Sequence, residues 1–167
     1  MRSAYYDKDN IAVILSLLTP SNALALEVSL YTGLRITDVL NLKTSAISER
    51  FTVQEQKTGK RRVVRLSKSL ADRCIKAGGS VFVFPNRLNG RKPRTRQAVF
   101  KDLKRACDLL RVRVNLTPHS MRKIYAVEEY KKYGSIARVK KLLNHDNEAV
   151  TLLYCMADQL KERTGKK

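Results

Sequence analysis

Cysteine and histidine are scarce in this chain, which contains three cysteines and two histidines among 167 residues. Cys74, Cys107 and Cys155 are odd in number and lie far apart, so they do not indicate a disulfide framework. With two histidines and no CxxC pair, the sequence also argues against a structural zinc site.

Long apolar segments are missing as well. The first residues, MRSAYYDKDN, lack the apolar run of a signal peptide. No stretch of the chain is both long and apolar enough to span a bilayer. We therefore expect a soluble, cytoplasmic protein with no membrane partner.

Acidic residues are few compared with basic ones: 15 Asp and Glu against 34 Lys and Arg, a formal net charge of +19. Because such a charge costs self-repulsion, it favours a polyanionic partner. Nucleic acid is the first candidate, since each neutralised phosphate releases condensed counterions. A ribosome-associated protein, or simply a soluble basic protein, would carry the same charge. Hydrophobic content of 43% and four prolines argue against disorder.

Most of the chain shows helical periodicity and helix-end signals. Thr19, Pro20 and Gly33 mark the two ends of one helix, and Thr95 and Thr117 are good N-caps. These signals predict helices over residues 9–18, 19–33, from Thr37 onward, 95–112, from Thr117 onward, 135–143 and about 147–160.

One region is different. Residues 46–67 alternate and are rich in β-branched side chains, and KTGK supplies a turn, so a β-hairpin is predicted there. VFVFP, over Val81–Pro85, is predicted as a third short strand. The fold class is therefore α+β: a single, mainly helical domain over 1–167 with a small three-stranded antiparallel sheet. Residues 1–20 form a lead-in helix, and 155–167 form a short C-terminal tail.

The stretch TPHSMRK places both a histidine and an arginine at a helix start. With Thr117 as cap and Pro118 in the first helical position, His119 and Arg122 share one face at i and i+3. The helix N-terminus favours an anion and keeps His119 neutral, able to donate or accept a proton. A capping histidine and a solvated surface arginine would give the same pattern.

A second arginine stands in YTGLRITDVL. Arg35 lies between the helix end at Gly33 and the expected cap at Thr37, and Asp38 could hold a cationic side chain in place. An ordinary joint between helices, with a surface arginine, is the simpler alternative. Lys57, in the hairpin turn, is one lysine among many.

The second histidine, His145, follows a helix that ends at Asn144 in LLNH. Tyr154 stands nine residues later, beside apolar Leu152 and Leu153. Alone, this tyrosine fits a core position better than a nucleophile.

Taken together and in order, these motifs resemble the tyrosine recombinase (phage integrase) family. TGLR with an acid three residues on, a lysine in a hairpin, HxxR, and a histidine nine residues before a tyrosine occupy residues 24–156. The resemblance implies the catalytic-domain fold of that family and an enzyme that cuts and rejoins DNA at specific sites.

By position, the resemblance implies a phosphate clamp. Arg35 and Arg122 would grip the non-bridging oxygens of the scissile phosphate with their planar, always-charged forks. His145 would add a further hydrogen bond, and Asp38 would support the clamp.

The remaining roles concern the nucleophile and the protons. Tyr154 would attack phosphorus and leave a 3′-phosphotyrosyl enzyme with a free 5′-hydroxyl, while His119 would assist proton transfer near it. Lys57, with Lys60 as the alternative, would protonate the departing 5′ oxygen. The cationic residues would make the phenolate more accessible and replace metal ions, and the covalent bond would conserve energy, so no cofactor, metal or ATP is expected.

The implied partners are double-stranded DNA, further copies of the chain assembled as a tetramer on paired sites, and accessory DNA-bending proteins. The enzyme would be associated with the nucleoid when acting on DNA. Further DNA contacts are expected from Lys60, Arg61, Arg91, Lys92, Arg94, Arg96 and Lys123, although a solvated basic loop would look the same.

The chain departs from the family pattern in three ways. Asn144 replaces the usual glycine before the second histidine, and Ile124 stands where threonine is common. The match begins about two dozen residues into the chain, so no separate N-terminal DNA-clamping domain is expected. A type IB topoisomerase-like nicking and closing enzyme, or a catalytically silent DNA-binding protein with this fold, remains an alternative.

Overall fold

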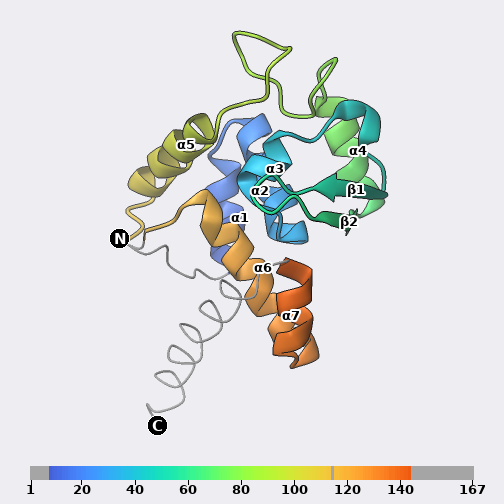
Figure 1. The fold of residues 1–167 in the computed structure, drawn as a ribbon. Helices are drawn as coiled ribbons and strands as arrows, with labels where there is room; N and C mark the ends of the chain where they lie inside the picture. Colours follow the sequence, from blue (N-terminus) through green and yellow to red (C-terminus); the bar gives the residue numbers. More distant parts are fainter. Residues whose placement is uncertain (1–7, 114, 144–167) are drawn as a thin grey trace.

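In the computed structural model, residues 8–113 and 115–143 are described. The elements in chain order are α1 (Lys8–Ser16), α2 (Pro20–Thr32), α3 (Ile36–Leu40), the 3₁₀ turn η1 (Thr44–Ala46), β1 (Arg50–Gln54), β2 (Arg61–Arg65), α4 (Lys68–Ala77), α5 (Arg96–Leu109), α6 (Pro118–Tyr133) and α7 (Ile136–Leu143). Helices dominate, and the β1–β2 hairpin lies beside α4 (Figure 1). The predicted mainly helical α+β class is confirmed.

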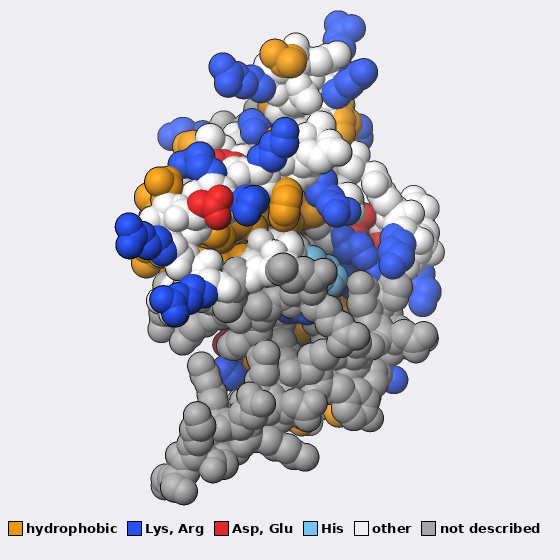
Figure 2. Space-filling view, turned by 90° about the vertical axis from the view of Figure 1, so that its left-hand side faces the viewer, with side chains coloured by type: hydrophobic (Ala, Val, Ile, Leu, Met, Phe, Trp, Pro, Cys, Tyr) orange, Lys and Arg blue, Asp and Glu red, His pale blue; other side chains and the backbone are white. Residues whose placement is uncertain are grey.

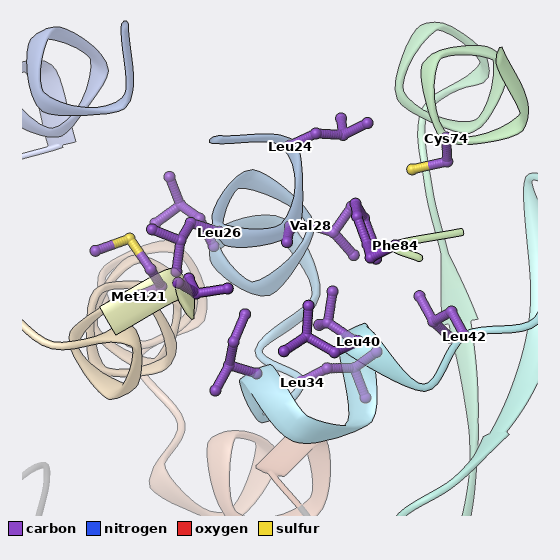
Figure 3. Packing of buried hydrophobic residues seen from close by; sticks show 14 of the residues in the cluster. Leu24, Leu26, Val28, Leu34, Leu40, Leu42, Cys74, Phe84 and Met121 are labelled. Atoms are coloured by element: carbon purple, nitrogen blue, oxygen red, sulfur yellow. The ribbon is translucent and has the colours of Figure 1, made fainter. Parts of the chain in front are cut away.

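Helix α2 is the centre of the fold. It packs against α1, α3, α4 and α6, and its side chains Leu24, Leu26 and Val28 are buried. In Figure 3, Leu26 and Val28 lie between Met121 of α6 and Phe84 of the connection before α5, and Leu24 lies above them. Because α2 is buried on nearly every side, it is the helix against which the elements that carry the candidate site pack.

The ends of α2 follow the predicted signals. Pro20 occupies the first turn, and Gly33 ends the helix in the left-handed conformation at φ 66°. The Gly33 N–H donates to the Ser29 carbonyl at 2.8 Å. Glycine adopts this conformation without the steric cost that a Cβ would add.

The predicted cap of the next helix is wrong. Arg35, not Thr37, is the N-cap of α3, and Thr37 lies inside the helix, where its carbonyl accepts from Asn41 Nδ2 at 2.8 Å. Gly33 turns the chain so sharply that Arg35, extended at φ −64° and ψ 144°, already leads into α3. Arg35 is therefore fixed directly at a helix start.

The predicted hairpin is confirmed. β1 and β2 pair antiparallel with Arg50 opposite Arg65 and Gln54 opposite Arg61. Phe51, Val53 and Val64 are the buried side chains of the two strands.

The predicted third strand is wrong: among the described residues the sheet has two strands. Residues 81–85 do not reach the hairpin. Val83 N–H donates to Leu42 O at 2.9 Å, Thr44 N–H donates to Val81 O at 3.2 Å, and Lys43 and Phe82 form a single bridge. The pairing stops there because the chain turns into η1 at Thr44.

Helix α4 was not predicted. Ser67 caps it by accepting from the Leu70 N–H at 3.3 Å, and Leu70, Ala71 and Cys74 form its buried face. The serine followed by apolar residues at this spacing was the signal.

The later helices agree with prediction where the structure describes them. Thr95 caps α5 by accepting from Ala98 N–H at 3.2 Å, Thr117 is the N-cap of α6, and α7 ends at Leu143. The helix predicted over 147–160 lies outside the described residues. Within the described ranges, no helix combines the length and apolarity needed to cross a bilayer.

Candidate active site

Three helix starts and the hairpin turn meet around one pocket of about 540 Å³. It brings together four of the six predicted catalytic residues, Arg35, Lys57, His119 and Arg122. The other described lining residues are Ile36, Thr37, Arg96, Gln97, Phe100, Thr117 and Pro118. None of the described lining residues is acidic, so the pocket suits an anion.

Arg122 is buried, with 1% of its surface exposed. Its Nη1 donates to the Gly33 carbonyl at 2.7 Å and its Nη2 to the Leu143 carbonyl at 2.6 Å. These two bonds join α6 to the end of α2 and the end of α7, and they fix the plane of the guanidinium at the pocket wall.

The contact between Arg122 and the Gly33 carbonyl also depends on the absence of a side chain at Gly33. A Cβ at Gly33 would lie 2.3 Å from Cδ1 of Tyr125, one turn along α6 from Arg122. The Tyr125 ring therefore packs directly on the Gly33 backbone, and its burial raises the pKa of the phenol. The TGLR motif keeps α2 and α6 close enough for Arg122 to reach the Gly33 carbonyl.

Arg35 is held by an acid that sequence reasoning missed. Its Nη1 donates to Glu55 Oε2 at 2.7 Å, and Glu55 is fully buried. The signal was present in the alternation of the hairpin: Phe51, Val53 and Glu55 occupy every second position and share the inward face. An acid on that face required a cation beside it.

Asp38 is also buried. Its Oδ1 accepts from the Gln56 N–H at 2.9 Å, so the acid on α3 braces the hairpin turn. Burial raises the pKa of this carboxyl, and the Gln56 hydrogen bond together with the charges of Arg35 and Arg122 only partly opposes that rise.

A third arginine stands behind the site. Arg62 on β2 donates to the Thr32 carbonyl, and its Nη1 lies 4.0 Å from Glu55 Oε1. Burial lowers the pKa of this guanidinium. Residues of the hairpin thus contact both the end of α2 and the acid that holds Arg35.

Lys57 and Lys60 lie in the same exposed turn, but they differ in their relation to the pocket. Lys57 lines the pocket, whereas Lys60 is not among its described lining residues. His119 occupies the second helical position of α6, and the Thr117 N–H donates to Ser120 Oγ at 3.1 Å to close that turn. His145 and Tyr154 lie outside the described residues.

The predicted DNA-contacting residues fall into two groups. Lys60, Arg61, Arg91, Lys92 and Arg96 are exposed. Lys123 is half-buried, and Arg94 donates from Nη1 to Asn22 Oδ1 at 3.1 Å, which fixes it to α2. Lys and Arg side chains spread over the described part of the face in Figure 2, with few acids between them.

Sequence reasoning also missed two pocket residues. Gln97 and Phe100, on the first turns of α5, line the pocket beside Arg96. Their signal was weak, because a helix start near a basic loop is common. No group of three or more His, Cys, Asp or Glu that could hold a metal ion occurs in the part of the chain that the structure describes.

Residues 5–161 match the model of the phage integrase family. The chain belongs to the phage integrase family. A tyrosine recombinase from Thermosipho africanus (strain TCF52B) is 30% identical over 98% of the chain and 61% of that protein. The probable integrase/recombinase YoeC of Bacillus subtilis (strain 168) is 24% identical over 81% of the chain and 77% of that protein.

Solved structures show the same fold. A lambda integrase dimer bound to a COC′ core site superposes with a TM-score of 0.76 at 22% identity, covering 91% of this chain and 48% of that one. The lambda integrase catalytic core matches with a TM-score of 0.71 at 22% identity, over 88% of this chain and 94% of that one. The chain thus spans about three fifths of its Thermosipho relative and about half of the lambda integrase chain.

Proposed function

We propose that this member of the phage integrase family is a site-specific recombinase that breaks and rejoins DNA strands through a 3′-phosphotyrosyl intermediate. The observation that carries the proposal is the pocket, which gathers Arg35, Lys57, His119 and Arg122 without a described acid in its lining. Family membership supplies the chemistry that these four residues fit.

The two arginines form the clamp for the scissile phosphate. Arg35 is fixed by Glu55 and Arg122 by two backbone carbonyls, so neither guanidinium has to be ordered when DNA binds. Fixed cations stabilise charge that develops on a pentacoordinate phosphorus without reorganisation at the moment of reaction. His145 would add a hydrogen bond to the same phosphate.

Tyr154 is the proposed nucleophile, and two residues of the pocket move the protons. Only about one unperturbed tyrosine in a thousand is ionised at neutral pH, since its pKa is about 10. His119, at the N-terminus of α6, assists proton transfer near the phenol. Lys57 gives its proton to the departing 5′ oxygen, and its place in the pocket favours it over Lys60.

The reaction needs neither ATP nor a metal ion in this account. Breaking the phosphodiester forms a phosphotyrosyl bond of similar energy, so a 5′-hydroxyl reverses the step. Arg35, Lys57 and Arg122 supply the positive charge that metal ions provide in many nucleases.

The proposed partner is double-stranded DNA, with assembly as a tetramer on paired sites. Related structures support this, since lambda integrase has been solved as a tetramer bound to a Holliday junction. Basic residues of the connection between α4 and α5, which projects from the top of Figure 1, are proposed to follow the DNA backbone. Arg91 and Lys92 are exposed there and Arg96 is exposed at the start of α5, whereas Arg94 is turned towards Asn22.

A covalent-capture experiment tests the proposal. The chain is incubated, without added metal or ATP, with a pool of nicked duplexes whose central sequence is randomised. Protein-linked DNA is then separated by denaturing electrophoresis and sequenced. We expect a covalent band with the wild-type chain and enrichment of one sequence class.

The matched control is Tyr154→Phe, which removes one oxygen. Loss of the band in this variant supports the assigned nucleophile, and a band that persists contradicts it. Covalent capture without sequence enrichment would instead favour a nicking and closing enzyme of the topoisomerase type. Binding without capture by the wild-type chain would favour a catalytically silent DNA-binding protein.

A further inference from the structure

Glu55 connects the hairpin turn with Arg35 at the pocket wall. Its Oε2 accepts from Arg35 Nη1 at 2.7 Å and from Thr58 Oγ1 at 3.2 Å. Its Oε1 lies 4.0 Å from Arg62 Nη1, and the side chain is fully buried. Burying a carboxylate is costly unless cations and hydrogen-bond donors surround it. Here Arg35, the N-cap of α3, and Thr58 in the turn donate hydrogen bonds to the carboxylate, and Arg62 on β2 adds a nearby positive charge.

The backbone of the same residue closes the turn that carries Lys57. The Glu55 N–H donates to the Lys60 carbonyl at 3.0 Å, and the Gly59 N–H donates to the Glu55 carbonyl at 2.8 Å. Gly59, at φ 67°, allows the chain to reverse between these two bonds. Glu55 therefore holds the base of the turn through its main chain and Arg35 through its side chain.

Lys57 is held through both of its neighbours in the chain. The Gln56 N–H donates to Asp38 Oδ1 at 2.9 Å, and the Thr58 hydroxyl donates to Glu55 Oε2 at 3.2 Å. Asp38 belongs to α3, the helix that Arg35 caps. Two buried carboxylates thus tie the turn to α3 and its N-cap Arg35. Asp38 binds the residue before Lys57, and Glu55 binds the residue after it.

We propose that Glu55 is a positioning residue that sets the Lys57 ammonium against the phosphate held by Arg35. This inference rests on the proposed function. When the bond from phosphorus to the 5′ oxygen breaks, the electron pair stays on that oxygen, which takes a proton from Lys57 and leaves a neutral amine. Misplacing a catalytic group by about 1 Å costs on the order of 100-fold in rate. An exposed lysine on a turn needs such anchoring more than a buried arginine does.

The test uses a leaving group that needs no proton. A duplex recovered by covalent capture is made in two forms, with oxygen or with sulfur at the 5′ bridging position of the scissile phosphate. A thiolate leaves without general-acid help, because the pKa of a thiol is only about 8.5. Cleavage rates of the full chain are measured on both forms for the wild type, for Glu55→Gln and for the exposed-carboxylate control Glu49→Gln.

We expect Glu55→Gln to cleave the oxygen substrate about 10- to 100-fold more slowly than the wild type. On the sulfur substrate it should stay within about threefold of the wild type, because the amide oxygen can still accept from Arg35 Nη1 and the misplaced proton donor no longer matters. Glu49→Gln, which makes the same charge change on an exposed side chain before β1, should match the wild type on both.

Equal losses on the two substrates would overturn the proposal, since they would place the effect of Glu55 on the phosphate clamp or on folding. Wild-type rates on both would overturn it as well. If Glu55→Gln does not fold, Thr58→Val decides: it removes the hydroxyl donor and leaves the Arg35–Glu55 ion pair. The same oxygen-specific loss is expected for it, and its absence would contradict the proposal. Failure of the wild-type chain on both substrates would instead contradict the proposed function.

Discussion

Asp102 on α5 is partly buried and Asp38 on α3 is fully buried, and the surroundings of these two carboxyl groups shift their pKa values in opposite directions. On α5, Asp102 Oδ2 accepts from Thr19 N–H at 2.9 Å, Thr19 Oγ1 at 3.0 Å and Asn22 Nδ2 at 2.7 Å. Its Oδ1 accepts from Arg105 Nη2 at 2.8 Å. Burial would raise the pKa of Asp102, but the donors from Asn22, Arg105 and Thr19 lower it to about 2.

Beside the pocket the balance is reversed. Burial dominates at Asp38, and the single backbone donor, from Gln56, does not offset it, so the pKa of this carboxyl is raised. The joint between α1, α2 and α5 gains stability from an ionised acid, whereas Asp38, beside the pocket, is an acid whose ionised form is costly. Active sites commonly give up stability in this way to hold a functional arrangement.

The largest effect is expected at Gly33, where an added Cβ meets the closest neighbouring atom of any described glycine. Gly33→Ala adds a Cβ that would lie 2.3 Å from the Tyr125 ring, on a residue whose backbone φ is 66°. Strain and overpacking together should lower the free energy of unfolding by about 2–5 kcal/mol. Urea denaturation measures this.

Gly134→Ala is the matched control for Gly33→Ala. Gly134 has a similar φ of 62°, but nothing lies within 4 Å of its added Cβ. It should lose only about 1–2 kcal/mol, the cost of the backbone conformation alone. Equal losses at the two glycines would contradict the packing of Tyr125 on Gly33.

Asp102→Ala should have the next largest effect. It removes the shared acceptor of Thr19, Asn22 and Arg105 and should cost about 1–3 kcal/mol in the free energy of unfolding. The covalent cleavage rate should change by less than about twofold at a temperature where both proteins are folded. Asp108→Ala, an exposed acid on the same helix, should stay within about 0.5 kcal/mol.

The pH dependence of this effect follows from the lowered pKa. The folded-state pKa of Asp102 is about 2, below its unfolded value of about 3.9. The stabilisation is therefore present above about pH 4 and is lost as pH falls towards 2. The difference in stability between the wild type and Asp102→Ala should shrink over that window in denaturation curves. A difference that stays constant would contradict the assigned role of the ionised acid.

Asp38→Asn should have the smallest effect on stability and the opposite sign. Because the folded-state pKa of Asp38 is raised, its stabilising contribution is lost as pH rises through that pKa, and the ionised form costs stability at neutral pH. The amide oxygen still accepts from the Gln56 N–H. Unfolding at pH 7 should therefore show no loss, or a gain below about 1 kcal/mol. If Asp38→Asn lowered the free energy of unfolding as much as Asp102→Ala, the proposed contrast between Asp38 and Asp102 would be wrong.

Local signals predicted much of the framework. Pro20 and Gly33 bounded α2, Thr95 and Thr117 capped α5 and α6, and KTGK marked the hairpin turn. Each of these signals acts within a few residues of its own position. The order of the motifs singled out Arg35, Lys57, His119 and Arg122, and all four line one pocket in the structure.

Non-local pairings account for most of what was missed; the exception is α4, whose signal at Ser67 was local. Residues 81–85 had the composition of a strand, but their partners are residues 42–44 rather than the hairpin. Glu55 looked like one acid in a polar turn, and only the approach of α3 shows that it holds Arg35. Asp102 gave no local sign of its contacts with Thr19 and Asn22, more than 70 residues away. Such contacts depend on tertiary packing, which a single sequence does not encode in its local pattern.

The most direct measurement of the central claim is to locate the covalent bond. Captured protein–DNA adduct is digested with protease and nuclease, and the peptide that carries the remaining nucleotide is sequenced by mass spectrometry. The account predicts the nucleotide on Tyr154, one of seven tyrosines in the chain, linked through its 3′-phosphate. A nucleotide on any other residue, or a link through a 5′-phosphate, would contradict it.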